Sequence, residues 1–186
     1  PDIIFYYAQV AAGIAALLFV GILFLFKSCY RKVPPGRVLV NNRVRDTYVN
    51  FQGGLVLPVV HKAELMDISL KTIEVDRRGV DGLICKDNIR ADIKVTFFVR
   101  VNQTADDVRK VATAVGCERA SHQETVEELF VAKFSEALKT VGYNMDFVSL
   151  YNQRDTFKSQ IIEVIGEDLN GYHLEDAAID YLEQTP

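Results

Sequence analysis

The sequence predicts an α+β fold: a small antiparallel-rich sheet with helices packed on one face, preceded by one transmembrane helix. Three observations predict it. Residues 3–26 carry no charge, residues 90–101 alternate apolar and polar side chains, and residues 104–169 change to helical spacing before a last strand-like stretch at 173–184. Strands that come first, helices that follow and a strand that returns are typical of helices packed on one face of a sheet.

The uncharged residues 3–26 are long enough to cross a membrane. At 1.5 Å per residue they span roughly 36 Å, more than a hydrocarbon core of about 30 Å. A buried helix of a soluble protein is usually shorter and keeps a polar stripe. A cleaved signal peptide needs a basic start and small residues at its end. Here only Pro1 and Asp2 precede the stretch, which ends Leu-Phe-Leu-Phe. We therefore expect a retained transmembrane helix.

The residues after this helix predict its orientation. Six basic residues lie between positions 27 and 45, and the first acidic residue is Asp46. Basic flanks stay on the cytoplasmic side, so residues 1–2 are expected outside, with 27–36 as a basic juxtamembrane linker and 37–186 as a cytoplasmic domain at the inner membrane. The expected membrane-interface residues near the helix are Lys27, Cys29, Tyr30, Arg31 and Lys32. Two questions stay open: whether the basic cluster binds lipid headgroups, and whether the Cys29 thiol is acylated or unmodified.

Short strands are expected after the linker. The sequence Val-Pro-Pro-Gly at 33–36 should end the helix, and residues 37–41, 55–60, 63–70 and 71–75 read as strands. Gly53 and Gly54 are expected to form a turn. The apolar run that follows, with Leu55 and Leu57, is either core or a membrane-contacting loop, and the residues alone leave both interpretations open.

Residues 90–101 give the clearest strand signal, because a period of two means one buried and one wet face. The apolar side chains occupy the odd positions. The opposite face carries charges of both signs, which makes it our candidate contact surface between subunits of an oligomer; the simpler alternative is that it meets water. The candidate contact residues are Arg90, Asp92, Lys94 and Arg100.

Three helices are expected after this strand. Thr104 with Asp107 is a capping-box pattern, and Gly116 should end the first helix. Ser121 with Glu124 repeats the pattern for a helix that should end at Gly142, and a third helix is expected over residues 154–169. The predicted inward residues of the last two helices and the final strand are Val126, Leu129, Phe130, Phe134, Ala137, Leu138, Val141, Phe157, Ile161, Val164, Ile165, Leu174, Ala178, Ile179 and Tyr181.

The motifs of catalysis, cofactor binding and metal binding do not occur in the sequence. It contains no GxGxxG or GxxxxGK[ST] loop, no GxSxG elbow, and no paired Cys/His spacing around His61, His122 or His173. The net charge of −4 argues against a nucleic-acid partner, and three cysteines without a CxxC pair argue against a disulfide framework. We therefore expect no catalytic, cofactor or metal site.

A set of short motifs resembles a known superfamily. Val-Pro-Pro-Gly at 33–36 follows a membrane span, Gly-Gly-Leu-Val-Leu-Pro-Val-Val-His occupies 53–61, and Cys-Lys-Asp-Asn at 85–88 precedes the long strand. Their order resembles the band 7 (SPFH) superfamily of stomatins, prohibitins and flotillins, and most closely the bacterial flotillins.

The resemblance implies a membrane-anchored scaffold. It implies large ring-like homo-oligomers that organise membrane microdomains, lipid contacts, and a small NfeD-family membrane partner. Flotillins continue into a second subdomain and a coiled coil, so we expect a longer full-length protein, truncated here at residue 186. The alternatives are a single-span adaptor or regulatory subunit of another membrane complex, or, less favoured, a membrane-anchored enzyme.

Overall fold

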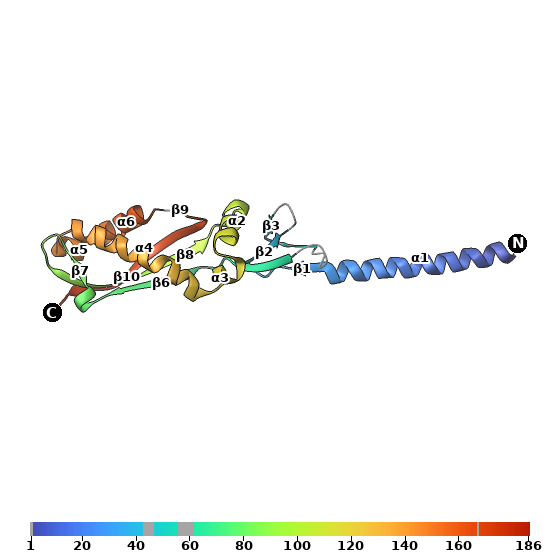
Figure 1. Cartoon of the computed structure of the whole chain (residues 1–186), viewed down its shortest axis with the longest axis horizontal. Helices are drawn as coiled ribbons and strands as arrows, with labels where there is room; N and C mark the ends of the chain where they lie inside the picture. The colour runs from blue at the N-terminus through green and yellow to red at the C-terminus, as the bar shows by residue number, and fades with distance from the viewer. Residues whose placement is uncertain (1, 43–46, 56–61, 167) are drawn as a thin grey trace. The chain divides into compact units, whose positions relative to one another are not determined.

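The chain begins with one long apolar helix, α1 (Asp2–Cys29). The structure, a computed structural model, describes residues 2–42, 47–55, 62–166 and 168–186. The chain divides into two compact units, 1–64 and 65–186. Figure 1 shows the elements of both units along the chain.

In the first unit, α1 covers the predicted span of residues 3–26 and continues three residues beyond it. Residues 9–29 are long and apolar enough to cross a membrane, and none of this segment is buried against protein. The chain then forms β1 (Tyr30–Lys32) directly, a strand that the sequence did not predict. The segment expected to be a plain linker is therefore partly helix and partly strand.

Two small antiparallel sheets contain the other strands of this region. In one, β1 pairs with β4 (Gly53–Leu55). In the other, β2 (Arg37–Asn42) lies between β3 (Thr47–Asn50) and β5 (Lys62–Asp67). The predicted turn at Gly53 and Gly54 is wrong, because both glycines are strand residues of β4 and the bend falls at 51–52. The rest of the expected strand, residues 56–60, lies outside the described residues.

The second unit is built on a five-stranded antiparallel sheet. Its order is β6 (Lys71–Arg77), β8 (Arg90–Val101), β10 (Tyr172–Gln184) and β9 (Asp168–Leu169), with β7 (Leu83–Ile84) also paired to β8. The central strand β8 has the predicted bounds. Its side chains alternate between buried and half-buried along the whole strand, as the period of two predicted.

Five helices follow β8, with the short 3-10 turn η1 (Gly79–Asp81) before it. They are α2 (Ala105–Ala114), α3 (Cys117–Ser121), α4 (Gln123–Asn144), α5 (Phe147–Asn152) and α6 (Arg154–Ile165). The apolar face of the sheet packs against them, with the Phe97 ring 4.6 Å from the Phe134 ring of α4. Figure 1 shows α4, α5 and α6 along this face of the strands, which confirms the predicted α+β class.

The start and end of α4 differ from the prediction. Ser121 ends α3 instead of capping α4: its hydroxyl donates to the Cys117 carbonyl and accepts from the Asp67 amide, so it is not available for α4. Gly142 lies inside α4, and the helix continues to Asn144. The glycine is needed there for space, since a Cβ atom at this position would overlap the buried side chain of Leu83.

The third helix and the last strand also differ in detail. The helix ends at Ile165, four residues early, because Gly166 adopts a φ of 80°. Leu129 and Val164 are 43% and 49% exposed, so their predicted inward positions are wrong. In β10, register shifts between Leu174/Asp176 and Ile179/Tyr181 change the phase of alternation. As a result Ala177 and Leu182 are buried, while the predicted Ala178, Ile179 and Tyr181 are only half-buried.

A partly buried ion pair joins the start of β6 to the end of β5, and its lysine also bonds the end of α3. Lys71, 9% exposed, places its ammonium 2.8 Å from the Asp67 carboxylate and 3.1 Å from the Ser121 carbonyl. The Asp67 carboxylate also accepts from the amide of Ser69. Burial alone raises the pKa of Asp67, but the hydrogen bonds from Lys71 and Ser69 outweigh it and hold this pKa below its usual value.

The close contact at Gly142 predicts that Gly142→Ala destabilises the fold. Alanine favours helix by up to about 1 kcal/mol, but overpacking a core typically costs about 1–3 kcal/mol, so we expect a net loss. The measurement is the denaturant midpoint of the full chain. Gly142→Ala should lower the midpoint less in a Leu83→Ala background than in the wild-type chain, because Leu83→Ala removes the overlapping side chain. Equal effects of Gly142→Ala in both backgrounds would contradict this account.

The ion pair predicts that the stability lost in Lys71→Met depends on pH. At pH 7 the substitution leaves the Asp67 carboxylate without its cation, at a cost of about 1–3 kcal/mol. Because the folded pKa of Asp67 is lowered, the pair stabilises the fold above the unfolded pKa of about 4 and loses this effect as pH falls through the folded value.

Denaturant midpoints of wild type and Lys71→Met should therefore differ more at pH 7 than at pH 3. Asp67→Asn is the matched control, because its midpoint should change less between the two pH values than that of wild type. A constant difference between wild type and Lys71→Met at both pH values would exclude the ion pair as the cause.

Candidate functional site

The residues expected at the membrane interface lie close together at the end of α1. Lys27 lies in the last turn of the helix, Cys29 is its last residue, and β1 follows with Tyr30. The pairing of β1 with β4 sets Tyr30 opposite Leu55 and Lys32 opposite Gly53. The sequence placed Tyr30 and Leu55 25 residues apart, and the ribbon of β1 and β4 brings their backbones together.

This ribbon assembles most of the expected interface residues. Arg31 pairs with Gly54 in the same ladder, and Tyr30 is 51% exposed at its start. Leu57 lies outside the described residues, so its predicted membrane contact stays a prediction. Sequence reasoning missed β1, because Pro34 and Pro35 pointed to a break after the helix and a three-residue strand has too few residues to show alternation.

The polar face of β8 carries the four candidate contact residues, and each has a partner within the chain. The Lys94 ammonium lies 2.9 Å from the Glu74 carboxylate of β6, and Arg100 pairs with Glu175 of β10. The Arg90 guanidinium donates to the Val80 carbonyl at 2.5 Å. These contacts tie β8 to its neighbours on both sides.

Asp92 completes this face. Its carboxylate accepts from the Gly79 amide at 2.8 Å and from the Thr185 hydroxyl at 2.5 Å. The hydrogen bond and charge of Glu74 raise the pKa of Lys94, so this lysine stays charged at neutral pH. The face therefore presents fixed, internally paired charges, and its role between subunits stays a prediction.

The thiols of the second unit are poorly suited to chemistry. Cys85 is fully buried, and burial together with the charges of Asp87 and Asp146 raises its pKa to about 11. Cys117 is 3% exposed. The reactive form of a thiol is the thiolate, which the raised pKa disfavours at Cys85. Within the described ranges, no group of three or more His, Cys, Asp or Glu side chains is placed to hold a metal ion.

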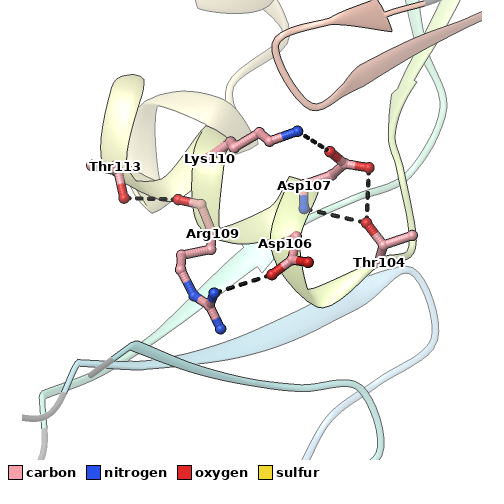
Figure 2. Close-up of polar contacts among 6 residues, drawn as sticks. All are labelled: Thr104, Asp106, Asp107, Arg109, Lys110 and Thr113. Carbon is pink, nitrogen blue, oxygen red and sulfur yellow. Dashed lines mark hydrogen bonds and ion pairs between the residues drawn. The ribbon is translucent and has the colours of Figure 1, made fainter.

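A broad hollow of about 790 Å³ lies along α2, from Asp106 to Ala114. Figure 2 shows the capping contacts there: the Asp107 amide donates to the Thr104 hydroxyl, and the Asp107 carboxylate bonds both this hydroxyl and Lys110. Arg109 pairs with Asp106 at 3.1 Å. The predicted cap at Thr104 is confirmed. Acidic and basic side chains are paired along its wall. The hollow therefore has no excess of one charge that would attract an ionic ligand.

The hydrogen bonds around Asp107 also stabilise the ionised form of its carboxylate. Donation from Lys110 and Thr104 lowers the pKa of Asp107 below its usual value, against a smaller opposing effect of burial. The carboxylate stays ionised at neutral pH, in the first turn of α2, where a negative charge stabilises the helix dipole. The contacts in Figure 2 therefore serve the start of the helix.

Comparison with known proteins gives one family and two relatives. Residues 31–181 match the SPFH domain / Band 7 family. The chain is 29% identical over 176 residues to the flotillin family inner membrane protein YqiK of Escherichia coli, covering 93% of this chain and 31% of that protein. It is 22% identical over 171 residues to the flotillin family inner membrane protein sll1021 of Synechocystis, covering 88% of this chain and 25% of that protein. The chain thus spans less than a third of either relative.

Proposed function

The chain belongs to the SPFH domain / Band 7 family, and from this membership we propose that it is a membrane-anchored scaffold of the flotillin type. It assembles with copies of itself, organises lipids and proteins around it, and performs no catalysis. The observation that carries the proposal is the direct connection of a bare apolar helix, through β1, to a Band 7 domain. Both relatives named above are flotillin family inner membrane proteins, which supports this role.

The anchor supports the membrane part of the proposal. Apolar side chains along α1 are 43–74% exposed from Val10 to Phe26. Exposing so continuous an apolar surface to water is unfavourable, and a bilayer removes it from water without any protein cover. A helix of 28 residues is about 42 Å long, so it crosses the hydrocarbon core with residues to spare at both ends.

The basic residues that follow the anchor support an orientation. Lys27, Arg31, Lys32 and Arg37 lie within eleven residues of one another on one side of the span. Positive charge of this kind is retained on the cytoplasmic side. We place the N-terminus outside, the domain from residue 37 in the cytoplasm, and the β1–β4 ribbon near the headgroups.

Self-assembly is the second part of the proposal. A closed ring forms when two different surfaces of a subunit meet head to tail and the rotation closes. A shared membrane anchor raises the effective concentration of neighbours, so weak contacts suffice. The polar face of β8 offers repeated charges at fixed positions, and contacts of about 0–1 kcal/mol each add up around a ring. Lipids and a small NfeD-type membrane protein are the further partners that the family resemblance implies.

The orientation predicts a labelling pattern. Val80 is 89% exposed, whereas Cys85 and Cys117 are buried, so Val80→Cys in a Cys29→Ser background supplies one reactive thiol. In intact spheroplasts this thiol should resist an impermeant thiol reagent, and after lysis it should react. Asp2→Cys in the same background is the matched control and should react before lysis. The reverse pattern would show that the domain faces outward.

The assembly predicts a ladder of cross-linked species in native membranes, ending in large rings of the extracted full chain. Lys94→Glu with Arg100→Glu should reduce the largest species, because both substitutions reverse the charge that this face presents. The internal pairs lost are worth no more than about 1 kcal/mol each, so the domain should stay folded.

The control for this experiment restores the internal pairs. Adding Glu74→Lys and Glu175→Lys re-forms both ion pairs with exchanged polarity while keeping the altered charge pattern. If the face contacts a neighbour, rings stay lost in this variant. Unchanged rings in the Lys94→Glu, Arg100→Glu variant would remove the face from the assembly, and a single defined partner with the unmodified chain would favour an adaptor.

A further inference from the structure

A second hollow of the domain, of about 340 Å³, lies where α2, α4 and the β9–β10 hairpin meet. Val115 lies just after α2, Leu129, Phe130 and Lys133 come from α4, and Leu169 and Tyr172 come from the hairpin. Its volume falls at the lower end of the roughly 300–1,000 Å³ that ligand pockets usually occupy. Ala114 and the exposed Asn170 complete the lining, and apart from Lys133, Asn170 and the hydroxyl of Tyr172 its side chains are apolar.

The Tyr172 hydroxyl is the unusual group of this wall. Tyr172 is 2% exposed, and its hydroxyl has no hydrogen-bond partner among the residues that the structure describes. Burial raises the pKa of this phenol to about 12, so it keeps its proton at neutral pH and is a donor. A buried donor without an acceptor costs free energy, which an acceptor brought by a ligand would recover.

The wall around this hydroxyl is preformed. The tip of the hairpin is held by the hydrogen bond from the Asn102 amide to the Gly171 carbonyl, at 3.0 Å. A Cβ at Gly171 would lie 2.6 Å from the Asp107 carbonyl oxygen, so the tip sits directly against α2. The Tyr172 ring meets the Phe130 ring edge-on at 5.1 Å, and Phe130 stacks on Phe134 at 5.7 Å.

The charge at the hollow is positive. Lys133 is exposed on α4, and no ion pair or hydrogen bond to its ammonium is found within the described ranges. No carboxylate from these ranges lines the hollow. A hydroxyl donor and an ammonium on walls that are mostly apolar, with Asn170 as a further polar residue, are complementary to an anionic group attached to an apolar body.

We propose that this hollow binds a small monocarboxylate with an apolar body, of the class of short fatty acids. The carboxylate accepts from the Tyr172 hydroxyl and faces the Lys133 ammonium, while the apolar body packs against Leu129, Phe130 and Leu169. The hydroxyl is covered, so reaching it needs a rotation of a side chain in the wall. A water molecule fits less well, because it needs two to four polar partners. The site does not depend on self-assembly of the chain.

The test uses the full chain in lipid nanodiscs and octanoate that carries a photoreactive diazirine at its last carbon. Saturable labelling is expected at residues 114–115, 129–133 and 169–172, displaced by unlabelled octanoate and not by octanol. Mapping the labelled peptides separates this site from simple partition into the bilayer. Labelling confined to α1, or equal displacement by octanol, would overturn the proposal.

Two variants test the two polar groups. Tyr172→Phe keeps the ring and should raise the half-saturating octanoate concentration roughly tenfold, since it removes a hydrogen bond to a charged acceptor. Lys133→Gln should raise it about two- to fivefold, whereas Lys139→Gln, the matched control on α4, should leave it unchanged. If Tyr172→Phe raises the melting temperature without changing the labelling, the hydroxyl binds no ligand and the proposal is wrong.

Discussion

The fold of the second unit depends on covering the apolar face of β8. All six odd-numbered side chains from Ala91 to Val101 are 0–2% exposed, so this face has to be removed from water along its whole length. The helices after β8 provide that cover, with Phe97 against Phe134 at its centre. Two close contacts result from this packing of helices on the sheet. Gly142 of α4 lies against Leu83 of β7, and Gly171 at the hairpin tip lies against α2.

The opposite face of β8 shows why a charged strand surface is hard to assign. Lys94, Asp92 and Arg100 face neighbouring strands, and their charges are satisfied within the chain. The two ion pairs are diagonal, because Lys94 lies opposite Asp76 and Arg100 lies opposite His173 in the ladders. They link β8 to β6 and to β10, and cross-strand pairs of this kind favour one register. A contact with another subunit would add to these pairs, so assembly and register would rest on the same side chains.

The helix α1 and the second unit differ in the kind of surface that they expose. The exposed apolar side chains of α1 suit a bilayer, whereas the second unit buries its apolar residues and exposes charges. The β1–β4 ribbon follows within one residue of the helix end, so the domain begins without a free linker. For a scaffold of the kind proposed, this short connection would hold the start of the domain close to the headgroups.

The elements whose signals are local could be predicted from the amino-acid sequence. The presence of a helix over residues 3–26, the bounds of β8 and the Thr104 cap of α2 agree with the structure, because each depends on spacing or on residues within one helical turn. Only the tertiary structure decided the rest. Position 142 lies inside α4 and has room only for a glycine, because Leu83 fills the space beside it. Ser121 bonds Asp67 54 positions away, and the bulges of β10 move its buried residues out of phase. The pairing of β1 with β4 and the hollow beside Tyr172 likewise join residues far apart in the chain, and periodicity within one segment carries no information about a contact with another.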